Sequence, residues 1–593
     1  MVRITCEVGN LRYLGGHLLC AISPCDTQRG ARKDSLGKPF VIRDPVHGYL
    51  RVAAHERIVV DHPVTQRLRR ITQTGLAELV FPEARTSRFV HSLGAMHLAS
   101  RFVISALEHA DDAVAEEFFE EFKKACGFGI KLNLQDLQSL LDPSEKKSTG
   151  GLLASRGAFQ NPLLRKNETY AALLGLAEAA VRLAALFHDL GHLPYSHDFE
   201  FALKSYAASA TSDAHKLSKL TAGTPHEILG HRLADLVFQG LADSSQPAGI
   251  RAAFQLAKDI LDEETVYHLP DPDTGVLGWL HSLVDGQVDV DRADYLLRDA
   301  RALGFEFAGY NLDQLIDNLV LVRDRSLGFI TAVDEKGLVA LESFFLSRAR
   351  SNQVLTRHHK SAQIGAAFRY ASVMALRSER ARSFLLELES ILNEASDGER
   401  ARGLLEAFSR HDDPWWLEAM REAKVNADQK LLMAARGTIL ERQPLLRSVW
   451  KRKGDLKESE RRKINTIADR ATEDLEAFES ATKKLREQHH VLIALHRFTP
   501  FSKTSKGKSV VLIRTRNGLR PASAMSSILR SLEDSWKGEV HMHAFTTEDN
   551  PMSPKDVIEL LNSGLEDPNG GRQRRRSTTA SKKRGRKDGK TGS

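Results

Sequence analysis

Cysteine is scarce in this chain, which has four cysteines among 593 residues. Four thiols cannot cross-link a fold of this size, so a disulfide framework is excluded and a reducing compartment is expected. Cys20 and Cys25 have the spacing of half a zinc site, but no pair of Cys or His follows at a suitable distance along the chain. We therefore expect no structural zinc ion there.

Long apolar runs are also missing. A helix that crosses a bilayer needs about 20 apolar residues, and the best candidate, Ala171 to Phe187, is interrupted by Glu178 and Arg182. The first residues lack the sustained apolar stretch of a signal peptide. With 42% hydrophobic and 27% charged residues, the composition is that of a globular protein. We expect a cytoplasmic, intracellular protein with no membrane partner.

Basic residues exceed acidic ones at one end only. The net charge is +7, yet the stretch 572–590 has ten Lys or Arg and one Asp, and so carries +9 by itself. This stretch has no large apolar residue that could anchor it to a core, which predicts disorder. Two interpretations stay open: a solvated tail without a strong role, or an arm that contacts nucleic-acid phosphates or acts as a localisation signal.

The spacing of apolar residues predicts a mainly α fold: a helical core with a small β-hairpin and a small C-terminal α/β unit. From Arg57 onward, apolar residues recur every three or four positions, which is typical of amphipathic helices. Short β-type runs between Leu319 and Leu341 predict the hairpin. The expected divisions are an N-terminal extension at 1–38, the core domain at 39–380 with an insertion at about 111–167, a helical region at 381–488, the α/β unit at 489–566 and a disordered basic tail at 567–593. We expect the insertion to be a mobile excursion, and the charged stretch Leu456 to Gln488 to form one long helix.

A histidine cluster is the first candidate for chemistry. The string HDLGHLPYSH at 188–197 directly follows a strongly apolar helical run. If the helix continues, His188 and His192 project from one face, and Asp189 lies about 100° away. A following glycine and proline should end the helix where these side chains emerge. Nitrogen and oxygen ligands of this kind suit Zn, Fe, Mn or Ni better than Ca.

Two further strings could complete a ligand set. His91 lies in SRFVHSLGAMH, at the start of an apolar helical pattern, and a stripe of acidic, aromatic and basic residues lies in DVDRADYLLRD. A single histidine on an apolar face is usually a core or surface side chain, and an aspartate at a helix start is usually a cap. The combination of the strings favours a site. The residues of the stripe are Asp291, Asp294, Tyr295 and Arg298, and Asp289 precedes them in the same string.

With these strings, the sequence resembles the HD-domain metal-dependent phosphohydrolases. The resemblance covers about residues 39–380 and is strongest to the deoxynucleoside triphosphate triphosphohydrolase branch, although no sterile-alpha-motif domain is visible. It implies that His91, His188, Asp189 and Asp291 hold a divalent metal ion (Mg, Mn, Fe, Zn or Ni). The shared strings are DPVHGY at 44–49, QRLRRITQTG at 66–75, VFPEARTSRFVHSLG at 80–94, LFHDLGHLPYSH at 186–197 and DVDRADYLLRD at 289–299.

The same resemblance implies roles for other residues. His192, His226 and the ligand Asp291 look like the catalytic group, and the implied reaction is attack of water at the α-phosphorus, which releases a deoxynucleoside and triphosphate. Gln73 and Asp299 resemble the contacts to the sugar. The residues that resemble the holders of the triphosphate are Arg88, His197, Arg292, Tyr295 and Arg348, with Arg350 as the alternative to Arg348.

Some positions depart from the family pattern. Where relatives have an aromatic residue against the base, this chain has Thr356 or, with a shift of one, Arg357; Thr74 replaces an apolar neighbour of Gln73. Sugar and base preference therefore stay open. The residues Asp61, Gln66 and Arg69 resemble an activating nucleotide site between subunits, and the simpler interpretation is a solvated helix start.

We predict an enzyme that hydrolyses deoxynucleoside triphosphates and forms a homo-oligomer. The alternatives are hydrolysis of another nucleotide or of nucleic-acid ends, and a regulatory scaffold that binds nucleotide or nucleic acid without hydrolysis. The complete set of predicted metal ligands argues against the scaffold.

Overall fold

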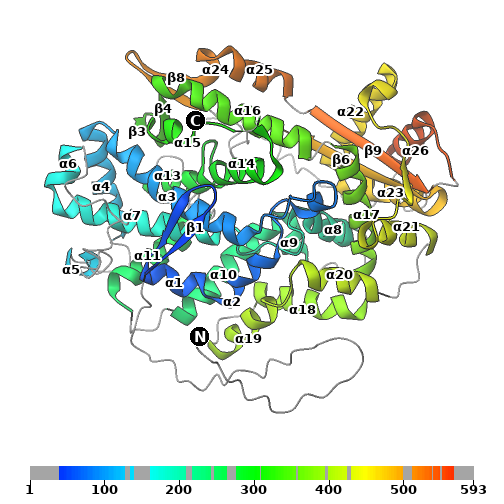
Figure 1. Cartoon of the computed structure of the whole chain (residues 1–593), viewed down its shortest axis with the longest axis horizontal. Coiled ribbons are helices and arrows are strands. Elements are labelled where there is room, and N and C mark those ends of the chain that lie inside the picture. The colour runs from blue at the N-terminus through cyan, green and yellow to red at the C-terminus, as the bar shows by residue number, and fades with distance from the viewer. Residues whose placement is uncertain are drawn as a thin grey trace, which may run out of the picture.

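The computed structural model describes residues 39–126, 134–138, 161–208, 217–241, 246–262, 275–306, 309–355, 358–393, 398–423, 429–498, 511–536, 539–547 and 550–566. The predicted N-terminal extension, 1–38, and the predicted basic tail, 567–593, lie outside the described residues. The prediction of a mainly α fold with small β elements is confirmed (Figure 1).

Two long helices form the centre of the molecule, α3 (Arg88–Glu108) and α7 (Glu168–Phe187). They pack against each other; α11 (Ala248–Leu261) packs on α7, and α14 (Val290–Leu303) packs on α3. α7 begins where the side chain of Asn167 accepts hydrogen bonds from the backbone N–H of Thr169 and Tyr170. Every residue from Ala171 to Phe187 is buried, so α7 is the axis of the core.

α7 has the length and hydropathy of a membrane span, but its apolar window is entirely buried inside the protein. The two charged side chains in this buried part of the helix, Glu178 and Arg182, are paired internally. Arg182 donates to the carboxylate of Glu56 at 2.6 and 2.8 Å, and Glu178 accepts from the hydroxyl of Ser100. These internal partners identify α7 as a core helix.

The other helices up to residue 375 surround this centre. They are α1 (Ala54–Val60), α2 (Pro63–Arg67), α4 (Asp112–Cys126), α5 (Leu134–Gln138), α6 (Pro162–Lys166), α8 (His197–Ala208), α9 (Ser218–Ala222), α10 (Pro225–Leu241), α13 (Val276–Val284), α15 (Leu312–Ile316), α16 (Leu338–Leu355) and α17 (His359–Ala375), with short 3-10 turns at Leu68–Arg70 and Gly75–Leu79. The helices that follow are α18 (Glu379–Asn393), α19 (Gly398–Phe408), α20 (Asp413–Glu422), α21 (Gln429–Leu440), α22 (Glu458–Glu473), α23 (Leu475–His489), α24 (Ala522–Met525), α25 (Ser527–Trp536) and α26 (Pro554–Glu566).

Two expectations about helices were wrong. The start of the predicted insertion is core, because α4 buries Phe118, Phe119 and Phe122; residues 139–160 of the insertion lie outside the described residues. The predicted long helix at 456–488 is two helices, α22 and α23. The helix is interrupted at Asp474. The carboxylate of Asp474 accepts a hydrogen bond from the backbone N–H of Ala477 at 2.8 Å and so caps the start of α23.

The strands form three small sheets. β1 (Phe40–Asp44) and β2 (Gly48–Val52) make a hairpin near the N-terminal side of the core. The hairpin predicted around 319–341 is present as β3 (Leu319–Asp324) and β4 (Gly328–Asp334), and β7 (Leu512–Thr515) and β8 (Gly518–Pro521) extend its sheet. The third sheet has the order β5 (Leu446–Ser448), β9 (Glu539–Thr547), β6 (Val491–Phe498).

The segment 489–566 therefore does not form a sheet of its own. β7 pairs in parallel with β4 of the core domain, and β9 pairs with β5 of the helical region. The sheet β5-β9-β6 lies between α17 on one face and α22, α23 and α26 on the other, as the right side of Figure 1 shows. The C-terminal strands thus close onto the domain that carries the predicted site.

Candidate active site

The HD pair lies just beyond the end of α7. The helix ends at Phe187, and His188 and Asp189 stand in the turn that follows. The expectation that His188 and His192 share one face of a continuing helix was therefore wrong. Instead, the turn is closed by a hydrogen bond from the backbone N–H of His192 to the carbonyl of Asp189, 3.1 Å long. The tight turn brings both imidazoles and the carboxylate to one end of the core helix.

The four predicted metal ligands converge at this end. Nε2 of His91 lies 3.5 Å from the carboxylate of Asp189 and 3.0 Å from that of Asp291. Nε2 of His188 lies 3.4 Å and 3.6 Å from the same two carboxylates. Ligand atoms of His91, His188 and Asp189 are close enough to one another to hold one ion, and Asp291 from α14 reaches both imidazoles.

The remaining contacts of the two imidazoles fit metal binding. Nδ1 of His91 lies 2.8 Å from the carboxylate of Asp294, and Nδ1 of His188 lies 2.6 Å from the carbonyl of Ala185. Each Nδ1 therefore carries the proton, which leaves the lone pair of Nε2 for a metal ion. Both Nε2 atoms are buried and have no hydrogen-bond partner among the described residues. The residues present therefore fit a divalent cation.

Asp294 is itself held in place. Its carboxylate accepts two hydrogen bonds from Arg298, at 2.7 and 2.8 Å, and lies 2.6 Å from Nε2 of His47. Asp294 is fully buried, and this pairing with Arg298 holds its pKa well below the ordinary value although burial alone would raise it. Within the stripe, Asp291 is therefore a predicted ligand, whereas Asp294 and Arg298 hold the imidazole of another predicted ligand, His91.

The carboxylates give the site a strong preference for positive charge. Burial opposes the protonated form of His91, but its contacts with Asp291 and Asp294 raise its pKa to about 10. Burial would raise the pKa of Asp291, but its contacts with His188 and His91 hold that pKa below the ordinary value. The same electrostatics would favour a bound divalent cation.

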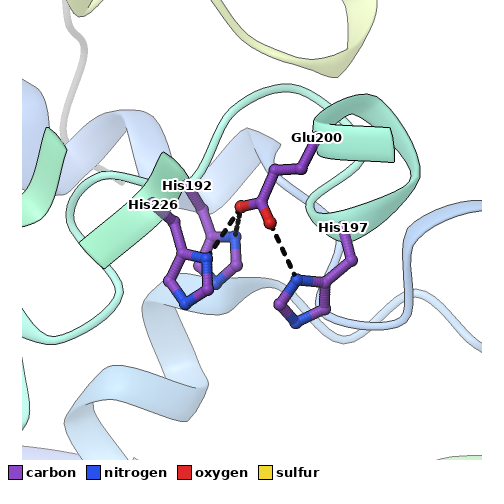
Figure 2. A group of neighbouring side chains, drawn as sticks. All are labelled: His192, His197, Glu200 and His226. Atoms are coloured by element: carbon purple, nitrogen blue, oxygen red, sulfur yellow. Dashed lines mark hydrogen bonds and ion pairs between the residues drawn. The ribbon is translucent and has the colours of Figure 1, made fainter. Parts of the chain in front are cut away.

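A second group of ligand-type side chains stands beside the first, and it consists of His192, His197, Glu200 and His226 (Figure 2). One carboxylate oxygen of Glu200 lies 2.8 Å from Nδ1 of His226, and the other lies 3.2 Å from Nδ1 of His197. The rings of His192 and His226 are stacked, with centroids 4.0 Å apart. Nε2 of His192 lies 3.2 Å from Asp189, so this group adjoins the metal ligands.

Glu200 was missed by sequence reasoning. It follows His197 by three residues at the start of α8, a spacing that places both on one side of a helix, and that spacing was the available signal. Burial alone would raise the pKa of Glu200, but hydrogen bonds with His197 and His226 hold it well below the ordinary value. Burial, with Arg88 and His226 close by, holds the pKa of His192 well below the ordinary value, so that imidazole is neutral.

A cavity of about 1230 Å³ opens over both groups. Oε1 of Gln73 and Oδ1 of Asp299 are buried in its wall without a hydrogen-bond partner among the described residues. Burial raises the pKa of Asp299 to about 7. The cavity brings together all the predicted substrate-binding residues, which are Gln73, Arg88, His197, Arg292, Tyr295, Asp299 and Arg348.

Two of the predicted phosphate-binding cations are engaged inside the site. Arg88 donates to Asp189 and to the hydroxyl of Ser196, both at 2.7 Å. Arg292 pairs with Asp289. Asp289 also caps the N-terminus of α14, the usual role of an aspartate at a helix start. Arg348 lines the cavity, whereas Arg350 is exposed and does not. An anionic ligand would therefore compete with Asp189 for Arg88 and with Asp289 for Arg292.

The loop between His192 and His197 is strained and held from a distance. Tyr195 and Ser196 have φ values of +58° and +56°, a backbone conformation that residues other than glycine rarely adopt. The carboxylate of Asp413, at the start of α20, accepts the backbone N–H of Tyr195 at 2.6 Å. It also accepts the backbone N–H and the hydroxyl of Thr72, at 2.9 and 2.6 Å. A helix outside the resemblance thus fixes the loop that leads into His197.

The residues predicted to bind an activating nucleotide lie elsewhere. Asp61 pairs with Arg57 at 3.0 Å on the surface, and Gln66 accepts from Arg69 at 2.7 Å. None of Asp61, Gln66 and Arg69 lines the described cavity. Thr356 and Arg357 lie outside the described residues, and Thr74 lines the cavity next to Gln73.

Comparisons with known proteins bear on the family. No family model matches the chain. It is 24% identical over 269 residues to the deoxynucleoside triphosphate triphosphohydrolase SAMHD1 of Gallus gallus, which covers 45% of this chain and 34% of that protein. It is 21% identical over 291 residues to the putative HD domain-containing protein L394 of Acanthamoeba polyphaga mimivirus, and this match covers 48% of this chain and 47% of that protein. A solved phosphohydrolase structure from Bacteroides thetaiotaomicron aligns with a TM-score of 0.48 at 20% identity, covering 86% of this chain and 100% of that one. The chain spans about half or less of the length of the curated relatives it matches.

Proposed function

We propose that this chain, which belongs to the HD-domain phosphohydrolase superfamily, is a metal-dependent hydrolase of deoxynucleoside triphosphates. The observation that carries the proposal is the convergence of His91, His188, Asp189 and Asp291, with both imidazoles oriented for ligation by contacts to Nδ1. A scaffold that only binds nucleotide would have no need of this oriented set.

A divalent ion held by these four residues would neutralise phosphate charge and lower the pKa of a bound water. The chain's own residues would position the substrate. Arg88, Arg292 and Arg348 would bind the triphosphate, and His197 and Tyr295 would add contacts to it. Gln73 and Asp299, whose buried oxygens lack partners among the described residues, would accept hydrogen bonds from the sugar hydroxyl.

The second histidine group would handle the proton. The oxygen of water bonds to the α-phosphorus, the bond from that phosphorus to the sugar O5′ breaks, and O5′ needs a proton. Glu200 fixes His226 with Nδ1 protonated, so Nε2 can exchange a proton with the reacting groups. The neutral His192, between Asp189 and the ring of His226, would orient the attacking water. The products would be a deoxynucleoside and triphosphate.

Assembly and activation are part of the proposal. The family resemblance implies a homo-oligomer, and Asp61, Gln66 and Arg69 would be its activating nucleotide site. A shift of mass with added nucleotide, lost in Arg69→Ala, would support this regulation. The same mass with and without nucleotide would contradict it.

The test is product analysis. Purified protein is incubated with each of the four dNTPs and four NTPs, alone and in mixtures, with Mg²⁺, Mn²⁺, Fe²⁺, Zn²⁺ or Ni²⁺, and the products are separated by anion exchange. We expect triphosphate and a deoxynucleoside, no product from the His188→Ala, Asp189→Ala double variant, and full activity after deletion of 572–593. Orthophosphate, a monophosphate or no product would contradict the proposed reaction and would favour another nucleotide or a nucleic-acid end as substrate.

A further inference from the structure

One face of the C-terminal sheet changes character along its length. Three successive cross-strand pairs of β6 and β9 lie on the face toward α17: Leu492 with Phe545, Ala494 with His543, and His496 with His541. The alternate residues, such as Val491, Val540 and Met542, face the other core with α22, α23 and α26. Since side chains on a strand alternate between faces, these pairs form one row. At one end of the row the pair is apolar, Leu492 with Phe545, and at the other end it consists of two imidazoles, His496 with His541.

The imidazole end of this row reaches the active-site cavity. His496 and His541 both line the cavity, whereas His543, two residues further along β9, does not. Burial, helped by nearby Arg369, lowers the pKa of His496 to about 4, so this imidazole is neutral near pH 7. A neutral imidazole presents one donor and one acceptor. Such a pair of groups suits the edge of a nucleobase better than a phosphate.

An exposed aromatic ring lies in the same wall. Phe201 on α8 lines the cavity with 45% of its surface exposed, although its helix neighbour Phe199 is fully buried. The guanidinium of Arg369 on α17 stands 5.2 Å from the Phe201 ring and close enough to His496 to affect its pKa. A half-exposed ring in a cavity offers a stacking surface for a planar ligand.

This wall adjoins the turn that follows Gln73, the proposed sugar contact. The 3-10 turn that follows Gln73 packs on α8 and α17, and α17 packs on β6 and β9. Ser361 on α17 also lines the cavity, and its buried hydroxyl has no hydrogen-bond partner among the described residues. A nucleotide with its sugar at Gln73 and its phosphates at the metal would extend its base toward these elements.

We propose that the C-terminal sheet forms the nucleobase-recognition wall of the cavity, with His496 and His541 contacting the base edge and Phe201 its face. The proposal rests on the proposed function, because it takes the substrate to be a nucleotide. It assigns a role in substrate selection to strands that lie beyond the region of resemblance.

The test uses the full-length variants His496→Ala and His541→Ala, with His543→Ala as the matched control from the same face of β9. Binding of the four deoxynucleosides, which lack phosphate, is measured by NMR titration, together with binding of inorganic triphosphate, which lacks a base. We expect the first two variants to weaken binding of the preferred deoxynucleoside about threefold to tenfold, as for one lost hydrogen bond to a base. Binding of triphosphate, and all binding by the control, should stay unchanged.

The outcomes separate the two proposals. Wild-type deoxynucleoside affinities in both His496→Ala and His541→Ala would overturn the recognition wall, even if dNTPs are hydrolysed. An equal loss in His543→Ala would also overturn it, because it would show a general effect on the sheet. Base-selective binding that depends on His496 and His541, without any dNTP hydrolysis, would support the wall and contradict the proposed function.

Discussion

Replacing Asp413 by alanine should disturb the candidate active site from outside the region of family resemblance. The carboxylate of Asp413 holds Tyr195 and Thr72 through three hydrogen bonds of 2.6 to 2.9 Å. A hydrogen bond to a charged group stabilises by about 1.5–3 kcal/mol. The positive φ values of Tyr195 and Ser196 each cost about 1–3 kcal/mol. Loss of the bond to Tyr195 is therefore comparable with the strain that it opposes, and the loop should relax.

Relaxation of this loop would move two functional groups. His197 directly follows it, and the hydroxyl of Ser196 receives a hydrogen bond from Arg88 at 2.7 Å. Because a displacement of about 1 Å can cost on the order of a hundredfold in rate, we expect Asp413→Ala to lower kcat/KM by about 10- to 100-fold. Most of the loss should be in kcat. Burial raises the pKa of Asp413 to about 6, so the assay is run at pH 8, where the carboxylate is ionised.

Asp412→Asn is the matched control. Asp412 caps α20 by accepting the backbone N–H of Trp415 at 3.0 Å, and asparagine can keep that bond. Asp412 pairs with Arg70 and makes no hydrogen bond to the Tyr195 loop among the described residues, so kcat/KM should change less than about twofold. Urea unfolding of each variant shows whether the fold is intact. Wild-type kcat/KM in folded Asp413→Ala would refute the reasoning that this carboxylate restrains the loop.

Three further predictions concern the core and the metal site. Asp294→Asn should weaken divalent-metal binding about 10- to 100-fold, measured by competition with a chelator, because Asp294 orients His91; unchanged affinity would contradict that role. Burial raises the folded-state pKa of Asp299 to about 7, above its unfolded value of about 4. The wild-type protein therefore loses stability as the pH rises from about 4 to about 7, because Asp299 must ionise while buried. In a chelator-treated sample, Asp299→Asn should be more stable than wild type at pH 8 and equally stable below pH 4. A constant difference in unfolding free energy across the pH range would argue against it. Arg182→Met should cost about 3–5 kcal/mol in urea unfolding because it leaves Glu56 buried without its partner, and Glu56→Leu added to it should restore most of the loss.

The sequence predicted the type of chemistry better than the path of the chain. The predicted ligands His91, Asp189 and Asp291 lie in short strings of residue types that suit a divalent metal ion, so they could be proposed without knowledge of the backbone. The end of α7 at Phe187 was not predicted. Apolar spacing continues into the turn, and hydrogen bonds of the turn, which close only in three dimensions, decide where the helix stops.

Residues that act over long distances left weaker signals. The sequence around Asp413 and His541 contains no motif that points to the site. Their roles depend on contacts with Thr72, Tyr195 and the cavity, hundreds of residues away in the chain. Local patterns determine secondary structure, whereas the pairing of distant strands depends on packing that one sequence does not encode locally.

The parallel pairing of β4 with β7 has a consequence for synthesis on the ribosome. Asp334 on β4 contacts Arg514 on β7, and the two residues are 180 positions apart. At about 5–20 residues per second, the edge of β4 waits roughly 10–40 s after its own translation before β7 is made. During this interval the nascent chain exposes an open strand edge, a surface prone to association with other chains. A polypeptide cut after residue 380 would keep that edge open permanently, so we expect the HD domain expressed by itself to aggregate, and chaperone demand to fall once residue 515 has left the exit tunnel.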